Sequence, residues 1–169
     1  MEMSGLDPER CAVLEIACIV TDGDLHELGE GVDLVIHQPE EVLLAMDDWC
    51  TRHHGQSGLT AAVNASTLSV RAAELRTLEY LKRHVNKGQS PLCGSSVSHD
   101  RRFIERYMSE LGSFLHYRTV DVSTVKELVK RWYDDVELPA KKNSHRALDD
   151  IRESIDELRF YRGKAFRSR

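Results

Sequence analysis

The sequence predicts an α/β or α+β fold, in which a β-sheet is covered by helices. Two apolar runs rich in β-branched residues lie near the start, at 12–20 and 32–36. From residue 40 the apolar residues recur with helical spacing, and two further short apolar runs, 91–94 and 116–120, interrupt the helical pattern. Strands followed by alternating helices and strands are typical of a sheet that buries its faces under helices.

The chain has 169 residues, the length of one domain, so we expect a single domain over 1–169. Hydrophobic residues make up 41% and charged residues 30%, as in ordinary globular proteins. No stretch approaches the roughly 20 apolar residues of a membrane span. We therefore expect a soluble protein without a membrane partner.

The net charge of −5 argues against long duplex nucleic acid as a partner. Sequence-independent binding of long nucleic acid neutralises many phosphates with lysine and arginine. A short nucleic acid is still compatible with this charge. We interpret the basic C-terminal residues as a solvated tail: Arg162, Lys164, Arg167 and Arg169.

Four cysteines are spread along the chain and form no Cys-x-x-Cys pair: Cys11, Cys18, Cys50 and Cys93. They predict buried thiols in a reducing compartment. Residues 1–10 have neither the basic start nor the apolar segment of a signal peptide. We expect a cytoplasmic protein, or a mitochondrial one if the source is eukaryotic.

The run 12–20 is too continuously apolar for a surface helix and predicts a strand with at least one buried face. A turn at 21–24 follows it. The run 32–36 then completes an antiparallel, hairpin-like unit through a loop that contains Gly29 and Gly31.

Four helices are expected after residue 65 from apolar residues on one face. One spans 70–85 and ends near Gly88, and a second covers 100–111. The third covers 122–133, and the fourth follows a polar connector at 139–143. The inward residues of these last two helices are predicted to be Val125, Leu128, Val129 and Trp132, and then Leu148, Ile151, Ile155 and Leu158.

Asp100 stands in an unusual place for an acid. It opens the predicted helix, and it shares a face with Phe103, Ile104 and Tyr107, which should be buried. A carboxylate on that face needs a partner. Asp100 is either the N-cap of the helix or a ligand of a hard divalent cation such as Mg²⁺ or Mn²⁺.

The segment Ser-His-Arg-Ala-Leu-Asp-Asp at 144–150 raises the same question. His145 and Asp150 are five steps apart, about 140° around a helix, so they can share a site only if His145 lies at or before the first turn. The alternative is a Ser144 cap with an acidic first turn. Helical spacing alone does not decide between Asp149 and Asp150. A further acid, Glu2, precedes a turn, and alone it is typical of a solvated side chain.

Together these segments resemble the DEDDh exonuclease family and, within it, the oligoribonucleases, over nearly the whole chain. The motifs that carry the resemblance are Glu-Met-Ser-Gly-Leu-Asp at 2–7, Met-Asp-Asp-Trp at 46–49, Cys-Gly-Ser-Ser-Val-Ser-His-Asp-Arg-Arg-Phe at 93–103, His-Tyr-Arg at 116–118, Asp-Val-Ser-Thr-Val-Lys-Glu-Leu at 121–128, and His-Arg-Ala-Leu-Asp-Asp-Ile-Arg-Glu-Ser at 145–154. As a set they are highly specific, although His-x4-Asp alone is a weak motif.

The family pattern is Asp-x-Glu, then Asp, then His-x4-Asp. The resemblance implies that Glu2, Asp100 and Asp150 are metal ligands and that His145 is the general base. It also implies two divalent cations, Mg²⁺ or Mn²⁺. Two cations about 4 Å apart activate the attacking water and stabilise the leaving oxygen, so several carboxylates must converge. A histidine with a pKa near ~6.5 takes the proton of water at neutral pH.

The first Asp of the pattern would stand two residues before Glu2, where this chain has no residue. In RNase H-like folds the first strand is central, and residues i and i+2 of a strand point the same way, which explains the Asp-x-Glu spacing. We therefore expect an RNase H-like α/β fold whose first strand is largely missing. We also expect an exonuclease domain that is N-terminally truncated relative to the family, with weakened metal binding and activity.

The implied activity is 3′-to-5′ degradation of very short RNA, such as dinucleotides, to nucleoside 5′-monophosphates. The resemblance places Leu6 between two bases and Trp49 on one of them, although each residue alone is more typical of core packing. A base stacked on an aromatic ring contributes about 1 to 3 kcal/mol, which suits a short ligand with few phosphates. The residues implied to hold the 5′ phosphate are Ser96, Arg118, Ser123 and Thr124.

The resemblance also implies a homodimer, in which Tyr117 completes the catalytic site of the partner. In a β-like run, Tyr117 alone is typical of a buried strand residue. Two alternatives stay open at this point. One is a catalytically impaired dinucleotide-binding protein that lacks the first metal-ligand Asp. The other is a DEDDh enzyme acting on DNA ends, which the short chain, the acidic charge and the segment 116–118 disfavour.

Overall fold

A three-stranded antiparallel sheet lies at the centre of the molecule. In the computed structural model, which describes residues 1–133, 136 and 146–166, its strands are β1 (Glu2–Met3), β2 (Val13–Cys18) and β3 (Val32–Val35), in the order β1-β2-β3. Both strands predicted from the two apolar runs are confirmed, and so is their antiparallel pairing. The predicted connector at 139–143, Ser144, His145, Arg167 and Arg169 lie outside the described residues.

β1 lies at the edge of this sheet, which differs from the central position expected for the first strand. It has two residues, and among the described strands it pairs only with β2. Glu2 stands directly opposite Glu15 in this pairing. The ladder therefore brings two carboxylates from neighbouring strands close together.

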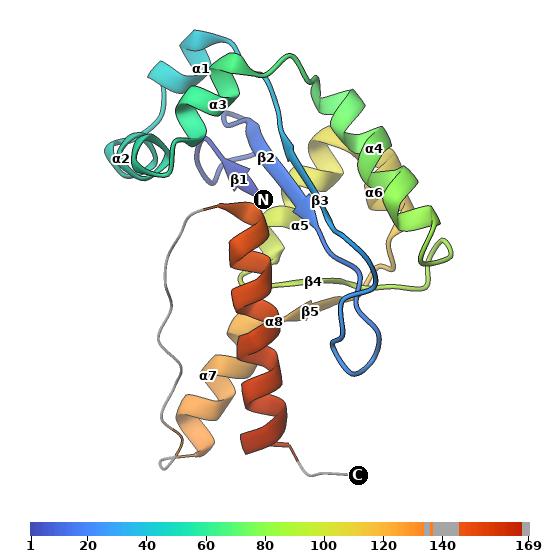
Figure 1. Ribbon diagram of the computed structural model, residues 1–169. Coiled ribbons are helices and arrows are strands. Elements are labelled where there is room, and N and C mark those ends of the chain that lie inside the picture. Colours follow the sequence, from blue (N-terminus) through green and yellow to red (C-terminus); the bar gives the residue numbers. More distant parts are fainter. Residues whose placement is uncertain (134–135, 137–145, 167–169) are drawn as a thin grey trace.

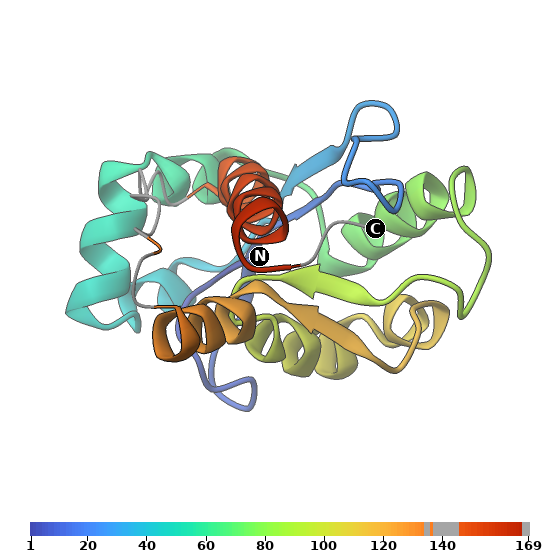
Figure 2. The same cartoon turned by 90° about the horizontal axis from the view of Figure 1, so that it is seen from below.

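A second, two-stranded sheet is parallel and consists of β4 (Leu92–Gly94) and β5 (Thr119–Asp121). Figure 2 shows these strands side by side. The predicted runs were placed correctly but assigned too much burial and length. Cys93 in β4 is exposed, and the segment 116–118 precedes β5 as exposed or half-buried chain. The expectation of a buried Cys93 is therefore wrong.

Helices cover both sides of the three-stranded sheet (Figure 1). Three of them, α1 (Glu40–Leu44), α2 (Asp48–Gln56) and α3 (Leu59–Ala65), lie on one side. On the other side lie α4 (Val70–Lys82), α5 (Ser98–Tyr107) and α6 (Ser109–Phe114). Two hydrophobic clusters fill the spaces, one around Ile16, Phe103 and Leu111 and one around Leu14 and Leu59. Each such side chain stabilises the fold by roughly 1.5 to 3 kcal/mol when fully buried.

The predicted helix over 100–111 is two helices that meet at Met108, whose φ of −135° and ψ of 60° are not helical. The break has a tertiary cause. The buried carboxylate of Glu74, on α4, accepts hydrogen bonds from the backbone N–H groups of Glu110 and Leu111 at 2.8 and 3.0 Å. These N–H groups have no partner within α6, so Glu74 caps the new helix.

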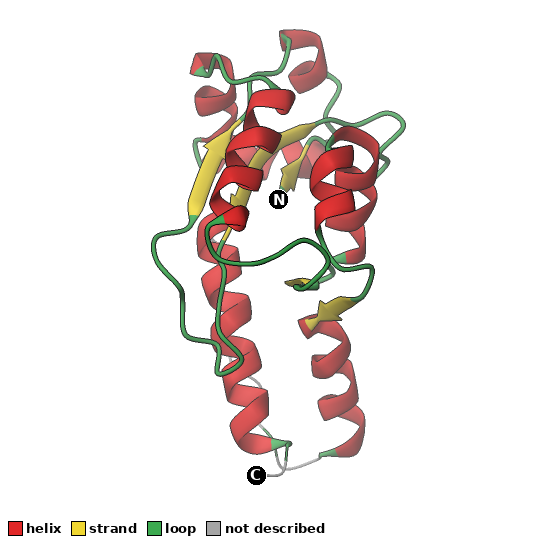
Figure 3. Ribbon diagram, turned by 90° about the vertical axis from the view of Figure 1, so that its right-hand side faces the viewer, coloured by secondary structure: helices red, strands yellow, loops and turns green. Residues whose placement is uncertain are grey.

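The last two helices, α7 (Val122–Trp132) and α8 (Ala147–Lys164), run side by side away from the sheets (Figure 3). Their predicted inward faces were partly wrong. Trp132 is exposed, and the buried face of α8 carries Ser154, Glu157 and Tyr161 instead of its aliphatic residues. The Tyr161 hydroxyl donates to Glu157 at 2.6 Å, so polar groups satisfy one another inside this contact.

The start of α8 packs on β2, and two of its arginines, one in each half of the helix, pair with acids of the loop before β3. Arg162 pairs with Asp24 at 2.6 Å, and the guanidinium of Arg152 lies 3.6 Å from the Glu27 carboxylate. Arg162 is therefore part of a helix with an ion-pair partner, which corrects its interpretation as a residue of a solvated tail. In the part of the chain that is described, no helix is both long and apolar enough to span a membrane.

Candidate active site

The side chain of Glu2, on β1, is mostly buried and lies beside other acids. Its side chain is 14% exposed, so the expectation of a solvated glutamate is wrong. Removal from water raises the pKa of Glu2 to about 7, and the charges of Asp150, Glu15 and Asp100 act in the same direction. A carboxyl group held among other carboxylates is destabilised as an anion, unless a cation joins it.

Asp100 binds a cation in the structure. It lies in the first turn of α5, behind the N-cap residue Val97, so the N-cap alternative is wrong. Its Oδ1 accepts a hydrogen bond from the α-amino group of Met1 at 2.9 Å. Burial alone would lower the pKa of this amino group, but the charges of Asp100, Glu2 and Asp150 raise it above its usual value.

Asp150 is the acid of the last helix that faces this position. It acts on both the Met1 amino group and the Glu2 carboxyl, whereas Asp149 is exposed. Of the two acids that helical spacing left open, Asp150 is the one whose charge acts on Glu2. Glu2, Asp100 and Asp150 all act on the Met1 amino group, and His145 lies outside the described residues.

The donor chemistry of this acid cluster suits a hard divalent cation, since its ligands are carboxylate oxygens. Among the described residues, however, no group of three or more His, Cys, Asp or Glu side chains is close enough to hold a metal as it stands.

A buried histidine, which sequence reasoning missed, lies behind Glu2. His54 on α2 is 1% exposed, and its Nε2 is 3.0 Å from the carbonyl oxygen of Met3. A carbonyl only accepts, so Nε2 carries the proton in this contact. The other ring nitrogen, Nδ1, is 3.8 Å from Glu2 Oε2. α2 therefore touches β1 at the acid cluster, and only the surrounding histidine-rich sequence hints at it.

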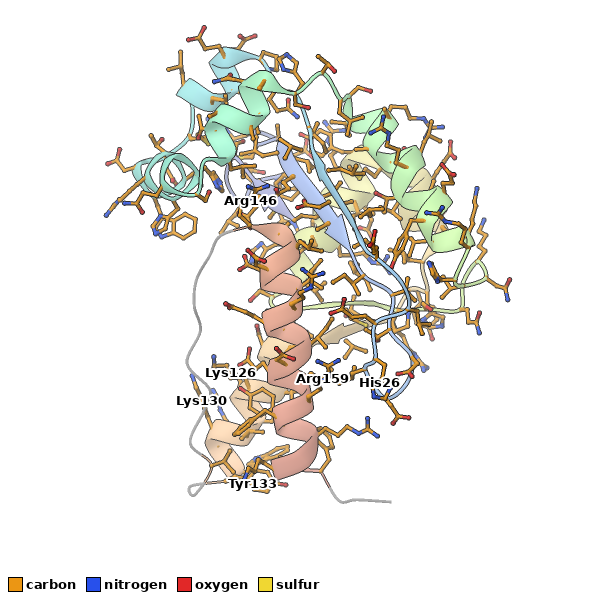
Figure 4. The ribbon with its side chains drawn as sticks, in the orientation of Figure 1. His26, Lys126, Lys130, Tyr133, Arg146 and Arg159 are labelled. Atoms are coloured by element: carbon orange, nitrogen blue, oxygen red, sulfur yellow. The ribbon has the colours of Figure 1, made fainter. Side chains whose placement is uncertain are left out.

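Sequence reasoning also missed Glu15, in the middle of β2. It is fully buried and binds the start of α8: its Oε1 is 2.6 Å from Arg146 Nη2, and its Oε2 accepts from the backbone N–H of Ala147 at 2.8 Å. In Figure 4, Arg146 lies at the upper end of α8, toward β2. The available signal was a lone charged residue in an apolar strand.

Leu6 projects from a closed loop instead of packing in the core. It is 61% exposed, which contradicts the core-packing interpretation. The loop is closed by the hydrogen bond from Ser4 N to Ala12 O at 2.9 Å. From α5, the Tyr107 hydroxyl reaches the carbonyl oxygens of Pro8 and Cys11, both at 2.8 Å. The loop thus holds an exposed leucine in a fixed place.

Trp49 is the second large apolar residue that core packing does not explain, because it is 51% exposed. It lies in α2 and stacks on His53, with ring centroids 4.0 Å apart. The same helix carries His54 on its buried face. α2 therefore connects an exposed aromatic surface with the acid cluster.

Ser96 and Ser123 meet where β4 and β5 end. Ser96 N donates to Ser123 Oγ at 3.0 Å and to Asp121 Oδ1 at 2.9 Å. Ser96 has a φ of 54°, in the left-handed region that costs energy for a residue with a side chain. Asp121 also caps α7, so it holds both serines. Thr124 is exposed on α7.

Tyr117 and Arg118 lie on the surface. Tyr117 is 74% exposed, so the buried-strand interpretation is wrong. The Arg118 guanidinium lies 5.4 Å from the centre of the Tyr117 ring, a cation–π contact. An exposed tyrosine of this size is suited to contact another molecule.

Comparison with known proteins shows the family of this chain. The model of the Exonuclease family, RNase_T, matches residues 1–158. An oligoribonuclease from Marinobacter nauticus is 55% identical over 168 residues, which cover 99% of this chain and 93% of that protein. The chain belongs to the oligoribonucleases of the exonuclease family. This assignment makes it a nuclease, a phosphodiester hydrolase, and confirms the expected resemblance.

Other oligoribonucleases are similarly close. The one from Pseudomonas aeruginosa PAO1 is 56% identical over 163 residues, covering 96% of this chain and 91% of its own. The one from Shewanella putrefaciens is 52% identical over 168 residues, covering 99% and 93%. Enzymes of the exonuclease family generally use divalent metal ions, in keeping with the carboxylates gathered here.

A solved structure shows the same fold at low sequence identity. An exonuclease I from Methylocaldum szegediense aligns with a TM-score of 0.70 and 19% identity. The alignment covers 97% of this chain and 39% of that one. The expected RNase H-like α/β fold is thereby confirmed.

Proposed function

We propose that this oligoribonuclease removes nucleoside 5′-monophosphates from the 3′ end of very short RNA, with dinucleotides as its characteristic substrate. The observation that carries the proposal is the acid cluster: Asp100 contacts the buried Met1 amino group, and the charges of Glu2 and Asp150 act on the same group. The printed names of the relatives support the substrate class. The exposed Leu6 and Trp49 support a site for bases.

Glu2, Asp100 and Asp150 would hold two divalent cations, Mg²⁺ or Mn²⁺. When bound, these would activate the attacking water and stabilise the leaving 3′ oxygen. The carboxylates must be ionised to bind, so Glu2, whose pKa is raised to about 7, gives up its proton as a cation arrives. We assign His145 the role of general base, on the His-x4-Asp spacing that it shares with Asp150.

The substrate end of the site selects for length. Leu6 and Trp49 would contact the two bases of a dinucleotide, and each is exposed although apolar. Ser96 and Ser123, held together by Asp121, would accept the 5′ phosphate with Arg118 and Thr124 nearby in sequence. Binding by stacking needs few phosphates, which fits a protein with a net charge of −5.

Turnover of labelled RNA tests this function. The full gene product is incubated in Mg²⁺ and in Mn²⁺ with a 5′-labelled diribonucleotide, a 20-mer RNA and a single-stranded 20-mer DNA. We expect labelled mononucleotide from the dinucleotide at a kcat/KM at least about tenfold above that for either 20-mer, a difference of 1.4 kcal/mol. Binding of the dinucleotide without any turnover would instead identify a catalytically impaired binding protein. A preference for the DNA would contradict the substrate class.

We also propose a homodimer, supported by the exposed Tyr117 beside Arg118. Tyr117 would contact the partner and contribute to its catalytic site. Light scattering after gel filtration should give twice the mass of one chain. Tyr117→Phe should keep this dimeric mass. Tyr117→Ala should lower kcat. A monomer with full activity would contradict this arrangement.

We propose a cytoplasmic location, or a mitochondrial one in a eukaryotic cell, on the four cysteines that are free thiols in the structure. Free thiols are maintained in reducing compartments. Fractionation of cells that express the native protein tests this, and recovery of the protein with oxidised cysteines from an extracytoplasmic fraction would contradict it.

A further inference from the structure

Glu15 is a charged residue in an apolar environment, and its burial needs an explanation. It lies in the centre of β2 between Leu14 and Ile16, and none of its surface is accessible. Isolated carboxylates are very costly to bury, so they keep their charge only with partners. Directly across the ladder stands Glu2, which adds repulsion rather than compensation.

Two residues at the start of α8, Arg146 and Ala147, bind the carboxylate of Glu15. Its Oε1 accepts from Arg146 through Nε at 2.9 Å and Nη2 at 2.6 Å. Its Oε2 accepts from the backbone N–H of Ala147 at 2.8 Å. Both carboxylate oxygens are thus used, by two consecutive residues of another element. Asp33 on β3 faces the same group, and burial and the Glu15 charge raise the pKa of Asp33.

This contact replaces a helix cap. The N-cap residue of α8 is Arg146, and its side chain makes no capping hydrogen bond. The first N–H groups of a helix have no partner inside the helix, and a negative charge there is favourable because of the helix dipole. Glu15 supplies both the acceptor and the charge from the central strand. The position of the first turn of α8 is therefore fixed by β2.

Asp150 belongs to that first turn. Its backbone N–H donates to the carbonyl oxygen of Arg146 at 3.0 Å. Asp150 is therefore linked by one hydrogen bond to the residue that Glu15 binds. Its carboxylate acts on Glu2, on the strand beside Glu15. We propose that Glu15 is a positioning residue, which sets the distance of Asp150 from Glu2 by binding Arg146 and Ala147. This role rests on the proposed function, in which both acids hold metal.

The substitution Glu15→Gln keeps the shape of the side chain and one acceptor, but it removes the negative charge that pairs with Arg146. Removing a group that orients a metal ligand typically costs 10- to 100-fold in metal affinity or activity. For Glu15→Gln we expect Mn²⁺ affinity, measured by calorimetry, and kcat to fall by about tenfold or more. KM for the dinucleotide should change less than about twofold, since the bases bind elsewhere.

The matched control is Glu27→Gln. Glu27 is also a glutamate that pairs an arginine of α8, Arg152 at 3.6 Å, but both side chains are partly exposed, 32% for Glu27 and 49% for Arg152. We expect unchanged Mn²⁺ affinity and kcat for this variant. Hydrogen exchange of the amides at 147–150 should become faster in Glu15→Gln and stay the same in the control.

A double variant separates positioning from stability. Replacing both members of a buried ion pair by apolar residues is often neutral for stability. Glu15→Leu with Arg146→Leu should keep a melting temperature close to the parent but retain the low kcat and weak Mn²⁺ binding. If the double variant does not fold, Glu15→Gln still decides.

Normal Mn²⁺ affinity and kcat in Glu15→Gln would overturn the positioning role, as would their full recovery in a folded double variant. If the parent protein cleaves no RNA, the proposed function fails. Mn²⁺ affinity and hydrogen exchange would then still test what Glu15 does.

Discussion

Single residues at the acid cluster combine burial with charge, and the environment of each decides its chemistry. Glu2 is destabilised as an anion, whereas Asp100 is in contact with a positive charge. Two neighbouring acids in α8 differ in the same way, because Asp150 faces the cluster and Asp149 faces solvent. The groups that each acid faces, and not its residue type, therefore decide its role.

At the same scale, the Tyr107 hydroxyl determines how firmly Leu6 is held. Tyr107→Phe removes the single hydroxyl proton that the carbonyl oxygens of Pro8 and Cys11 share, a hydrogen bond worth about 1 kcal/mol. We expect KM for a dinucleotide to rise about three- to tenfold, with a smaller change in kcat, in steady-state kinetics. Tyr161→Phe is the control, since its hydroxyl binds Glu157 between α7 and α8. Equal KM values in both variants would show that Tyr107 does not serve the loop.

The cysteines offer a chemical check of burial. Burial raises the pKa of Cys18 and of Cys50 to about 12 in each case, so at pH 8 almost none of either thiol is ionised. The thiolate is the reactive form. In native protein at pH 8, iodoacetamide should therefore modify the exposed Cys93 first, and reaction at Cys18 should become faster as the pH rises toward 12. Peptide mass spectrometry measures this order, and early labelling of Cys50 would contradict it.

Among the elements, α2 has two functional faces. Its exposed face carries Trp49 stacked on His53, and its buried face carries His54 against β1. The helix can therefore link the binding of a base to the position of Glu2. Its N-terminus is fixed by Asp47, which accepts from the backbone N–H of Cys50 at 2.7 Å.

The two tryptophans of the chain give a matched test of this element. Trp49→Ala should raise KM for a dinucleotide by about 5- to 150-fold, because a base stacked on an aromatic ring contributes about 1 to 3 kcal/mol. Trp132→Ala removes a ring from α7 that is even more exposed than Trp49, 66% against 51%, and should leave KM unchanged. Fluorescence quenching by the dinucleotide should be lost only in Trp49→Ala. A similar KM in both variants would exclude Trp49 from the site.

The elements also show how far the sequence reaches. β2, β3 and α4 were predicted from local patterns, since periodicity and turn residues determine them. The division of α5 from α6 was not predicted, because its cause, Glu74, lies on α4. Likewise, Tyr161 and Glu157 form a hydrogen bond on the buried face of α8. The pattern of polar and apolar residues therefore predicted the wrong buried face for this helix.

For the candidate site, the acids came from a family pattern and their environment came from the structure. The pattern predicted three acids, Glu2, Asp100 and Asp150. It gave no role to Glu15 or His54. Neither residue has a partner near it in the sequence: Glu15 binds residues more than a hundred positions away, and His54 reaches back to β1. Such long-range contacts leave no local signal.

In the whole molecule, the acids that we propose as metal ligands come from three elements that are far apart in sequence: β1, α5 and α8. β2 connects them, because it pairs with β1, packs against the core near α5 and holds α8 through Glu15. α8 is also held by the ion pairs of Arg152 and Arg162 with the loop before β3. The acid cluster is therefore a product of the complete fold.

The central claim, that Asp150 and its partner acids form the metal site of an oligoribonuclease, is tested most directly by two adjacent substitutions in one helix. Mn²⁺ affinity and dinucleotide turnover are measured for Asp150→Asn and Asp149→Asn. Asp150→Asn should lower both by on the order of 100-fold, because it removes a ligand of the cations that carry the reaction. Asp149→Asn should behave like the parent protein. Equal loss in both variants, or full activity in Asp150→Asn, would contradict the account.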